Sequence, residues 1–141
     1  MNLNQITIHS TDVNRAVQFY QLLGLQLIVD ASPRYVRLAC PTGDSTFSIS
    51  HTEQAFLNDT TLYFEVDDVD RTCEQLKGKG IHCDSQPTDQ RWLWRESILS
   101  DPDGHQLKIY SAGENRKNPP WKVLQPRWFD AFLDSPVNLM K

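Results

Sequence analysis

Two stretches of this chain resemble each other at a constant spacing of 56 residues. The first begins with DVNR at 12–15 and the second with DVDR at 68–71, and each is followed at the same distance by a glycine, Gly24 and Gly80. A constant spacing without gaps indicates one supersecondary unit that the chain uses twice. Because equivalent positions in two such units tend to face each other, the repeat also predicts where a site would lie.

Within each unit, the spacing of apolar residues predicts one strand, one helix and then three strands. Asp12 and Asp68 can cap the two helices, since an aspartate oxygen accepts hydrogen bonds from the free N–H groups of a first turn. Gly24 and Gly80 end the helices, because glycine readily takes the positive φ found just beyond a helix. The expected strands of the first unit are 6–10, 25–30, 35–40 and 46–51, and those of the second are 61–66, 81–84, 93–100 and 106–110.

The repeat predicts an α+β fold class with two tandem βαβββ modules. Module 1 covers residues 5–53 and module 2 covers residues 60–112, and the linker is too short for independent movement, so residues 1–141 form a single expected domain. The C-terminal extension, 113–141, has no counterpart in either module. Its aromatic residues, including Trp128 and Phe132, predict a short amphipathic helix that packs on the body or on a partner subunit.

Charge and composition narrow the possible partners. The net charge of −4, without clustered lysine and arginine, argues against nucleic acid, because phosphate neutralisation needs grouped cations. No apolar stretch approaches membrane-spanning length and no leader is evident, so a cytoplasmic protein without membrane contact is expected. Three cysteines without CxxC spacing suggest neither a disulfide framework nor a zinc cluster, and Cys73 falls on the apolar stripe of a helix.

Several short motifs occur in an order and spacing typical of one superfamily. They are Asp12-Val13, Phe19-Tyr20 and Leu23-Gly24-Leu25 in module 1, and Asp67-Asp68-Val69, Gly80-Ile81 and Asp101-Pro102-Asp103-Gly104-His105 in module 2. Together they resemble the vicinal oxygen chelate superfamily: glyoxalase I, fosfomycin and bleomycin resistance proteins, methylmalonyl-CoA epimerase and extradiol dioxygenases. The resemblance spans about residues 5–111, and the extension, with Pro119-Pro120-Trp121, is similar to that of a glyoxalase-like branch of unsettled function.

This resemblance implies that each module curls into a half-barrel and that the two form a cleft. In the family, four inward side chains hold a divalent metal that chelates the substrate, and in this sequence the four positions are Gln5, Ser48, Thr61 and Lys108. A protonated lysine has no lone pair and repels a cation, and only Gln5 is a familiar ligand among the four. We therefore expect no metal cofactor at the usual place.

Strand alternation predicts a polar concave face. The inward residues expected to bind a ligand are Gln5, Thr7, Ser48, Thr61, Tyr63 and Tyr110, and analogy with fosfomycin resistance proteins adds Trp92, Trp94 and Glu96. Indole walls with a few convergent polar groups are typical of a small-ligand pocket.

Four inward residues carry a charge or a proton suited to catalysis, namely Lys108, Glu96, Glu65 and His9. Lys108 could stabilise a carboxylate, a phosphate or a developing enolate, while the other three could move a proton. Alternatively, Lys108 forms a structural ion pair with Glu65 or Glu96, and His9 is a hydrogen-bonded strand residue.

The other aromatic and ionisable residues have simpler expected roles. Trp92 and Trp94 suit either a pocket wall or packing beneath the extension. Arg95 is expected to point away from the cavity and to pair with an acid such as Asp89. The residues expected to be solvated are His51, Glu53, His82 and His105.

The sequence thus predicts a glyoxalase/bleomycin-resistance-like protein with a polar, Trp-walled cavity for a small anionic or carbonyl-containing molecule. Its activity would be that of a metal-independent isomerase or lyase, and the alternative is a non-catalytic binding or resistance protein. A second alternative is a metal-dependent lactoylglutathione lyase or dioxygenase with a displaced site, for example His9 with Glu65. The expected partners are a small-molecule ligand and a second copy in a homodimer.

Overall fold

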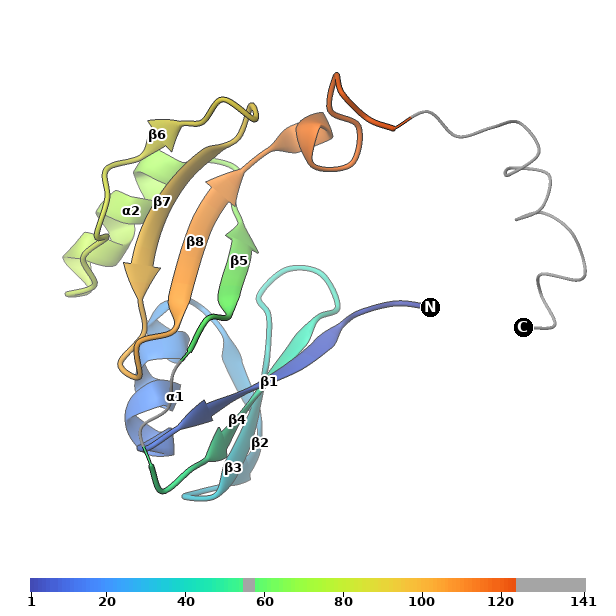
Figure 1. Cartoon of the computed structure of the whole chain (residues 1–141). Helices are drawn as coiled ribbons and strands as arrows, with labels where there is room; N and C mark the ends of the chain where they lie inside the picture. The colour runs from blue at the N-terminus through green and yellow to red at the C-terminus, as the bar shows by residue number, and fades with distance from the viewer. Residues whose placement is uncertain (55–57, 124–141) are drawn as a thin grey trace, which may run out of the picture.

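A computed structural model describes residues 1–54 and 58–123, and in this part the chain forms two modules of one helix and one four-stranded sheet each (Figure 1). The α+β class and the doubled βαβββ order are thereby confirmed. The amphipathic helix predicted around Trp128 and Phe132 lies outside the described residues. No helix within the described ranges is long and apolar enough to cross a membrane.

Module 1 has one parallel and two antiparallel strand pairs. Its elements are β1 (Gln5–Ser10), α1 (Val13–Leu22), β2 (Gln26–Ala31), β3 (Tyr35–Ala39) and β4 (Thr46–His51). The strands are ordered β1-β4-β3-β2. β1 runs parallel to β4 because α1 carries the chain from β1 to the far edge, β2, from which β3 and β4 follow as antiparallel neighbours.

Module 2 repeats this order. Its elements are β5 (Thr61–Glu65), α2 (Val69–Gly78), β6 (Thr88–Asp89), β7 (Arg95–Ser100) and β8 (Gln106–Ser111), followed by a 3-10 turn, η1 (Gly113–Arg116). The strands are ordered β5-β8-β7-β6, with β5 parallel to β8. The two segments that resemble each other in sequence therefore have the same strand order and the same strand pairing.

One predicted strand is wrong and another is shorter than predicted. Residues 81–84 are not a strand, because the Ile81 amide closes the end of α2 on the Leu76 carbonyl. The Asp84 amide then donates to the Ile98 carbonyl at 2.6 Å, but ladder pairing begins only at Thr88 and Asp89. The strand predicted to begin at residue 93 begins at Arg95, since Leu93 takes a positive φ of 68° that breaks the extended backbone.

Both helices begin and end as the sequence predicts. The Asp12 side chain accepts a hydrogen bond from the Arg15 amide at 3.1 Å, and Asp68 accepts one from the Arg71 amide at 3.0 Å. Gly24 takes a φ of 101° just beyond α1, a conformation that a side chain would strain. Turns of this kind fix the direction in which β2 leaves α1.

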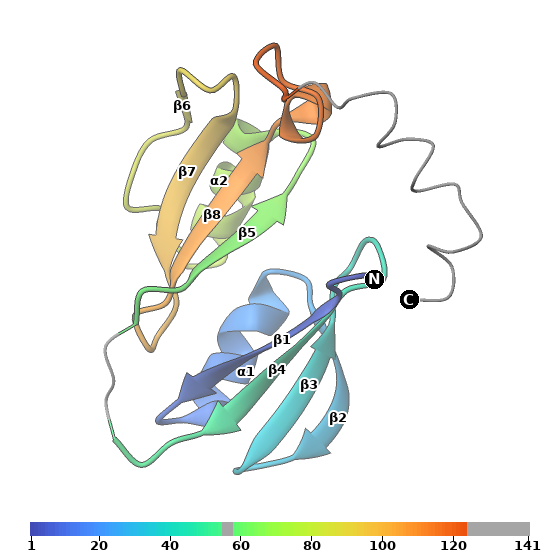
Figure 2. The same cartoon turned by 45° about the vertical axis from the view of Figure 1, so that its right-hand side comes forward.

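The core lies between each helix and its own sheet. In Figures 1 and 2, α1 and α2 lie on the same side of the two sheets, so the opposite faces of both sheets carry no helix. The buried apolar residues of this core include Ile8, Val13, Ala16, Val17, Tyr20, Leu25, Val36, Leu38, Phe47 and Ile49 in module 1, and Leu62, Val69, Leu76, Ile81, Leu99, Leu107 and Ile109 in module 2. The helix-free faces are therefore where polar side chains gather, as strand alternation predicts.

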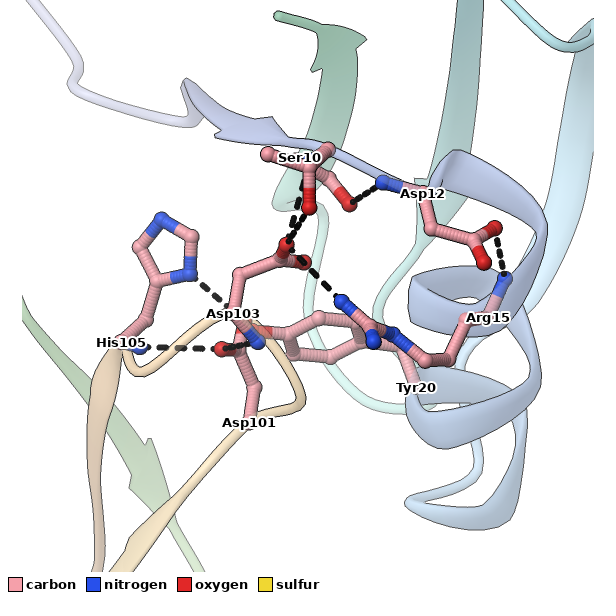
Figure 3. Close-up of polar contacts among 8 residues, drawn as sticks. Ser10, Asp12, Arg15, Tyr20, Asp101, Asp103 and His105 are labelled. Carbon is pink, nitrogen blue, oxygen red and sulfur yellow. Dashed lines mark hydrogen bonds and ion pairs between the residues drawn. The ribbon is translucent and has the colours of Figure 1, made fainter. Parts of the chain in front are cut away.

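A buried polar cluster joins the two modules at the turn between β7 and β8 (Figure 3). The hydroxyl of Tyr20, from α1, donates to Asp101 Oδ2 at 2.7 Å, and His105 Nδ1 lies 2.7 Å from the same oxygen. The other carboxylate oxygen accepts the backbone amides of Asp103 and His105 at 2.9 Å. The expectation that His105 is solvated is wrong, since its side chain is 2% exposed.

Asp103 adds further contacts between the two modules, which together with the buried polar cluster form what we call the joint. Its Oδ1 accepts hydrogen bonds from the backbone amide of Thr11 at 3.1 Å and from the Arg15 guanidinium at 3.3 Å (Figure 3). The DPDG turn thus holds the end of β1 and the start of α1. Through it, one module fixes the orientation of the other.

Candidate functional site

Three aromatic rings form a cluster on the helix-free face of module 2. Trp94 and Tyr110 stack with ring centroids 4.6 Å apart and an interplanar angle of 18°. Tyr63, from β5, meets both rings edge to face, at 6.1 Å from Trp94 and 5.8 Å from Tyr110. Because Tyr63 is exposed, this aromatic cluster presents ring surface to solvent.

An ion pair lies beside the aromatic cluster. Lys108 Nζ is 3.0 Å from Glu96 Oε1, and the two side chains are only 17% and 4% exposed. The ammonium also lies over the rings of Tyr63, at 5.5 Å, and Trp92, at 5.9 Å, where the negative ring faces attract a cation. Glu96 Oε2 is buried and has no hydrogen-bond partner among the described residues.

Two alternatives left open by the sequence concern the contacts of Lys108 and Trp94. Lys108 does form an ion pair, with Glu96 as its partner, while Glu65 lies at the C-terminal end of β5, opposite Tyr110. Trp94 contacts the extension, since its indole N–H donates to the carbonyl of Asn115 at 3.2 Å. Its ring also belongs to the aromatic cluster, and its use as a pocket wall stays a prediction.

Arg95 points away from this cluster, as predicted. It contacts Asp89 at 3.0 Å, and it also pairs with Asp70 of α2 at 2.7 Å. Both acids lie on the surface, so this network ties β7 to β6 and α2 and takes no part in the site.

The helix-free face of module 1 carries a hydrogen-bonded network. Gln5 Nε2 donates to Ser48 Oγ at 2.7 Å, and the hydroxyls of Ser48 and Tyr35 are 2.7 Å apart. The Arg37 guanidinium donates twice to the Tyr35 oxygen, at 3.0 and 2.9 Å. The hydrogen bonds with Ser48 and Arg37 lower the pKa of Tyr35.

A cavity of about 720 Å³ separates the facing edges of the modules, where β1 and β5 lie next to each other (Figure 2). Gln5, Thr61, Tyr63 and Glu65 line it together with apolar residues of both modules. The cavity thus reaches one side of the aromatic cluster. Burial, followed by the charge of Glu65, raises the pKa of Tyr110 at that side.

The remaining predicted residues lie on β1. Thr7 pairs in register with Ser48, and His9 pairs with Ser50 on the neighbouring strand. This places both with Gln5 on the helix-free face of module 1. The predicted residues therefore divide into a module 1 group and a module 2 group, with Thr61 at the cavity between them.

The donor set does not fit the divalent metal that the fold implies. Both amide atoms of Gln5 are already hydrogen-bonded, since Nε2 reaches Ser48 and Oε1 accepts from Thr46. Lys108 brings a positive charge to the fourth position. Nowhere in residues 1–54 and 58–123 do three or more His, Cys, Asp or Glu side chains gather as a metal site. His9 and Glu65, proposed as a displaced pair, belong to different modules.

Sequence reasoning missed Arg37 and Tyr35. The signal was present, because β3 pairs with β4 so that Arg37 lies opposite Ser48 and Tyr35 opposite Ser50, on one face of the sheet. Extending the alternation from β4 to β3 would have found both.

Comparisons with known proteins agree with this architecture. The model of the family described as Glyoxalase/Bleomycin resistance protein/Dioxygenase superfamily matches residues 2–109. The uncharacterized protein YraH of Bacillus subtilis (strain 168) is 30% identical over 129 residues, which cover 78% of this chain and 98% of the relative.

Solved structures are similar in fold. A glyoxalase/bleomycin resistance protein/dioxygenase from Nocardioides has a TM-score of 0.71 at 17% identity, covering 88% of this chain and 90% of its own. A lactoylglutathione lyase from Agrobacterium tumefaciens has a TM-score of 0.65 at 15% identity, covering 78% of this chain and 92% of its own. At such identities the likeness concerns the fold.

Proposed function

Because the chain belongs to the glyoxalase/bleomycin resistance protein/dioxygenase superfamily, we propose that it binds a small planar molecule on its helix-free face without using a metal. The observation that carries the proposal is the aromatic cluster of Tyr63, Trp94 and Tyr110 beside the Lys108–Glu96 ion pair. A flat ring can stack or pack edge-on against exposed aromatic surface, which contributes about 0.5–1.5 kcal/mol beyond the area buried.

The polar groups beside the rings would orient such a ligand. An ammonium has three N–H donors, and Lys108 directs one of them at Glu96, so others remain for a carbonyl or carboxylate oxygen. Glu96 Oε2 offers a buried acceptor to a ligand N–H or O–H. The site therefore favours a planar molecule with a carbonyl group, as the sequence suggested.

Tryptophan fluorescence tests this proposal directly. A panel of planar aromatic carbonyl and carboxylate compounds is screened by thermal shift in the presence of EDTA, because a ligand of the native state raises its stability by mass action. Hits are then titrated by fluorescence against the wild type, Trp94→Phe and the control Trp121→Phe, whose ring is 57% exposed on the extension.

Quenching should saturate in the wild type and in Trp121→Phe, and the affinity should fall several-fold in Trp94→Phe, with the ligand recovered unchanged by mass spectrometry. Saturable binding with equal affinity in all three proteins would place the ligand elsewhere and refute the proposal.

A second candidate function is metal-independent isomerase or lyase chemistry next to a carbonyl. The observation in its favour is that Glu96 Oε2, a buried and unpartnered carboxylate oxygen, stands beside the ammonium of Lys108. Such a pair could hold a proton and stabilise an oxyanion. Incubation of a bound carbonyl compound in D₂O separates the two functions: deuterium at the α-carbon that is lost in Lys108→Ala supports catalysis, and an unlabelled ligand supports binding alone.

We further propose that the protein acts as a cytoplasmic homodimer. In the described residues β1 and β5 are edge strands with no neighbour on their outer sides, and the cavity between them is lined largely by apolar residues. Light scattering after gel filtration tests the dimer: twice the mass of 16.3 kDa supports it, and the monomer mass contradicts it.

A further inference from the structure

The network of module 1 holds an arginine, Arg37, that forms no ion pair with an acid in the part of the chain that the structure describes. Arg15, Arg95 and Lys108 each lie within ion-pair distance of a carboxylate. Arg37 does not, among the residues that the structure describes, and its hydrogen bonds go to the phenol oxygen of Tyr35 alone. A guanidinium has five N–H donors, so three remain for another partner.

The same network has more protons than acceptors. The oxygens of Tyr35 and Ser48 together have four lone pairs and two protons. Three lone pairs receive N–H groups from Arg37 and Gln5, and the fourth receives the hydrogen bond between the two hydroxyls, which uses one proton. Because Arg37 fills both lone pairs of the Tyr35 oxygen, Tyr35 is the donor to Ser48, and the Ser48 proton has no acceptor inside the network.

The position of this group suits a ligand. Arg37 and Tyr35 are half-buried on the helix-free face, and Ser48 beneath them is fully buried. Tyr35 holds the guanidinium from one side, with Arg37 Cζ 5.7 Å from the ring centroid, so the fork is oriented before any ligand arrives. A positive charge with surplus donors needs an anion that has several acceptor oxygens.

We propose that Arg37, oriented by its two hydrogen bonds to the Tyr35 oxygen, binds an oxyanion group, a carboxylate or a phosphate monoester, of a small ligand. This inference rests on the proposed binding function and gives the ligand an anionic end. It also assigns that end to Arg37 in place of Lys108, because Glu96 already compensates the charge of Lys108. Oxyanions match a guanidinium fork, which can donate two parallel hydrogen bonds.

Arginine NMR signals test the site without a known ligand. Inorganic phosphate, and acetate in a second series, are titrated at constant ionic strength while the Nε–Hε signals of Arg37 and of Arg34 are followed. Arg34 is the matched control, because it lies three residues away on the exposed turn before β3. The Arg37 signal is expected to shift along a saturating curve, and the Arg34 signal only in proportion to concentration. Saturation by phosphate alone would identify the group as a phosphate, and saturation by both would include carboxylates.

Two variants complete the test. Arg37→Gln should weaken phosphate binding about 10-fold or more, since it removes a charge-assisted contact, and Arg34→Gln should leave the affinity unchanged. Absence of saturation at Arg37 in the wild type, or equal weakening in both variants, would overturn the proposal. The fluorescence titration reports on module 2 and therefore tests the proposed function separately. Phosphate binding at Arg37 without any aromatic ligand would support this site and refute the proposed function. An aromatic ligand without phosphate binding at Arg37 would support the proposed function and refute this site.

Discussion

The hydroxyl of Tyr20 offers the sharpest test of how the two modules are held together. Tyr20→Phe removes the 2.7 Å hydrogen bond to Asp101 Oδ2 and leaves the ring in place, so almost no cavity forms. Asp101 is ionised at neutral pH: burial opposes its charge, but the hydrogen bonds from His105, Tyr20 and the His105 amide outweigh burial and lower its pKa. A hydrogen bond to a charged group contributes about 1.5–3 kcal/mol, and a buried carboxylate that loses one keeps its desolvation cost.

We therefore expect Tyr20→Phe to lower the free energy of unfolding by about 2 kcal/mol at pH 7. Urea denaturation followed by circular dichroism measures this change, with Tyr63→Phe as the control, because Tyr63 lies exposed on the opposite face of its sheet. The control should change stability by less than about 0.5 kcal/mol. A loss in Tyr20→Phe no larger than that of the control would refute this account of the joint.

The acid response of the same variant has a definite sign. The folded-state pKa of Asp101 lies below the unfolded value of 3.8, so its stabilising effect is present above pH 3.8 and is lost as the pH falls through the folded-state pKa. Tyr20→Phe removes one cause of the lowered pKa. The variant should therefore lose less stability than the wild type as the pH falls below 3.8, so that the difference between the two proteins narrows on acidification in urea denaturation.

Three further predictions concern the ion pair, a helix cap and a thiol. Lys108→Met leaves Glu96 buried without its cation and should lower the free energy of unfolding by about 3 kcal/mol in urea denaturation. The double variant Lys108→Met with Glu96→Gln should recover most of that loss. Equal losses in the single and double variants would argue against the ion pair. Asp68→Ala removes the cap on the Arg71 amide and should cost about 1 kcal/mol by the same measurement, and no loss would contradict the capping contact. Burial, together with the Cys83 thiol 3.2 Å away, raises the pKa of Cys73 from 9.0 to about 11. The thiolate fraction of Cys73 near neutral pH should therefore be about 100-fold lower in the folded protein than in urea. Mass spectrometry of iodoacetamide alkylation should show the same difference in rate.

The sequence was sufficient for the doubled fold because local chemistry and the repeat agree. Asp12 and Asp68 cap the helices, Gly24 takes the positive φ beyond the first, and alternation correctly sends Ile8 and Leu62 to the helix side. Each of these features depends on residues close together in sequence or on the period of a strand, both of which can be read without coordinates.

Long-range contacts could not be predicted in the same way. His105 lies in a turn, where a solvated side chain is the usual expectation, and only the approach of Tyr20 from the other module buries it. The predicted strand at residues 81–84 failed for a similar reason. Asp84 does reach β7, where its amide donates to the Ile98 carbonyl at 2.6 Å, but the strand ladder on that edge is formed by Thr88 and Asp89 of β6. Strand pairing is decided by tertiary structure more than by local preference.

The candidate site is intermediate between these cases. The sequence correctly brought Lys108, Glu96, Tyr63 and Trp94 to one face, and it proposed Glu96 as one of two partners for the lysine. It did not include Arg37, because the alternation was followed along β4 but not across to β3. For the anionic ligand that the sequence predicts, we propose Arg37 in place of Lys108, because no acid forms an ion pair with Arg37 among the described residues.

Indole NMR signals of metal-free protein test the central claim most directly. A hit from the thermal-shift panel is added in the presence of EDTA, and the Nε1–Hε1 signals of Trp92, Trp94 and Trp121 are followed. Saturable shifts of Trp92 and Trp94, with Trp121 unchanged, are the result expected for a ligand beside the Lys108–Glu96 pair. Shifts that require added Zn²⁺, or binding that leaves the signals of Trp92 and Trp94 unmoved, would contradict a metal-independent site on this face.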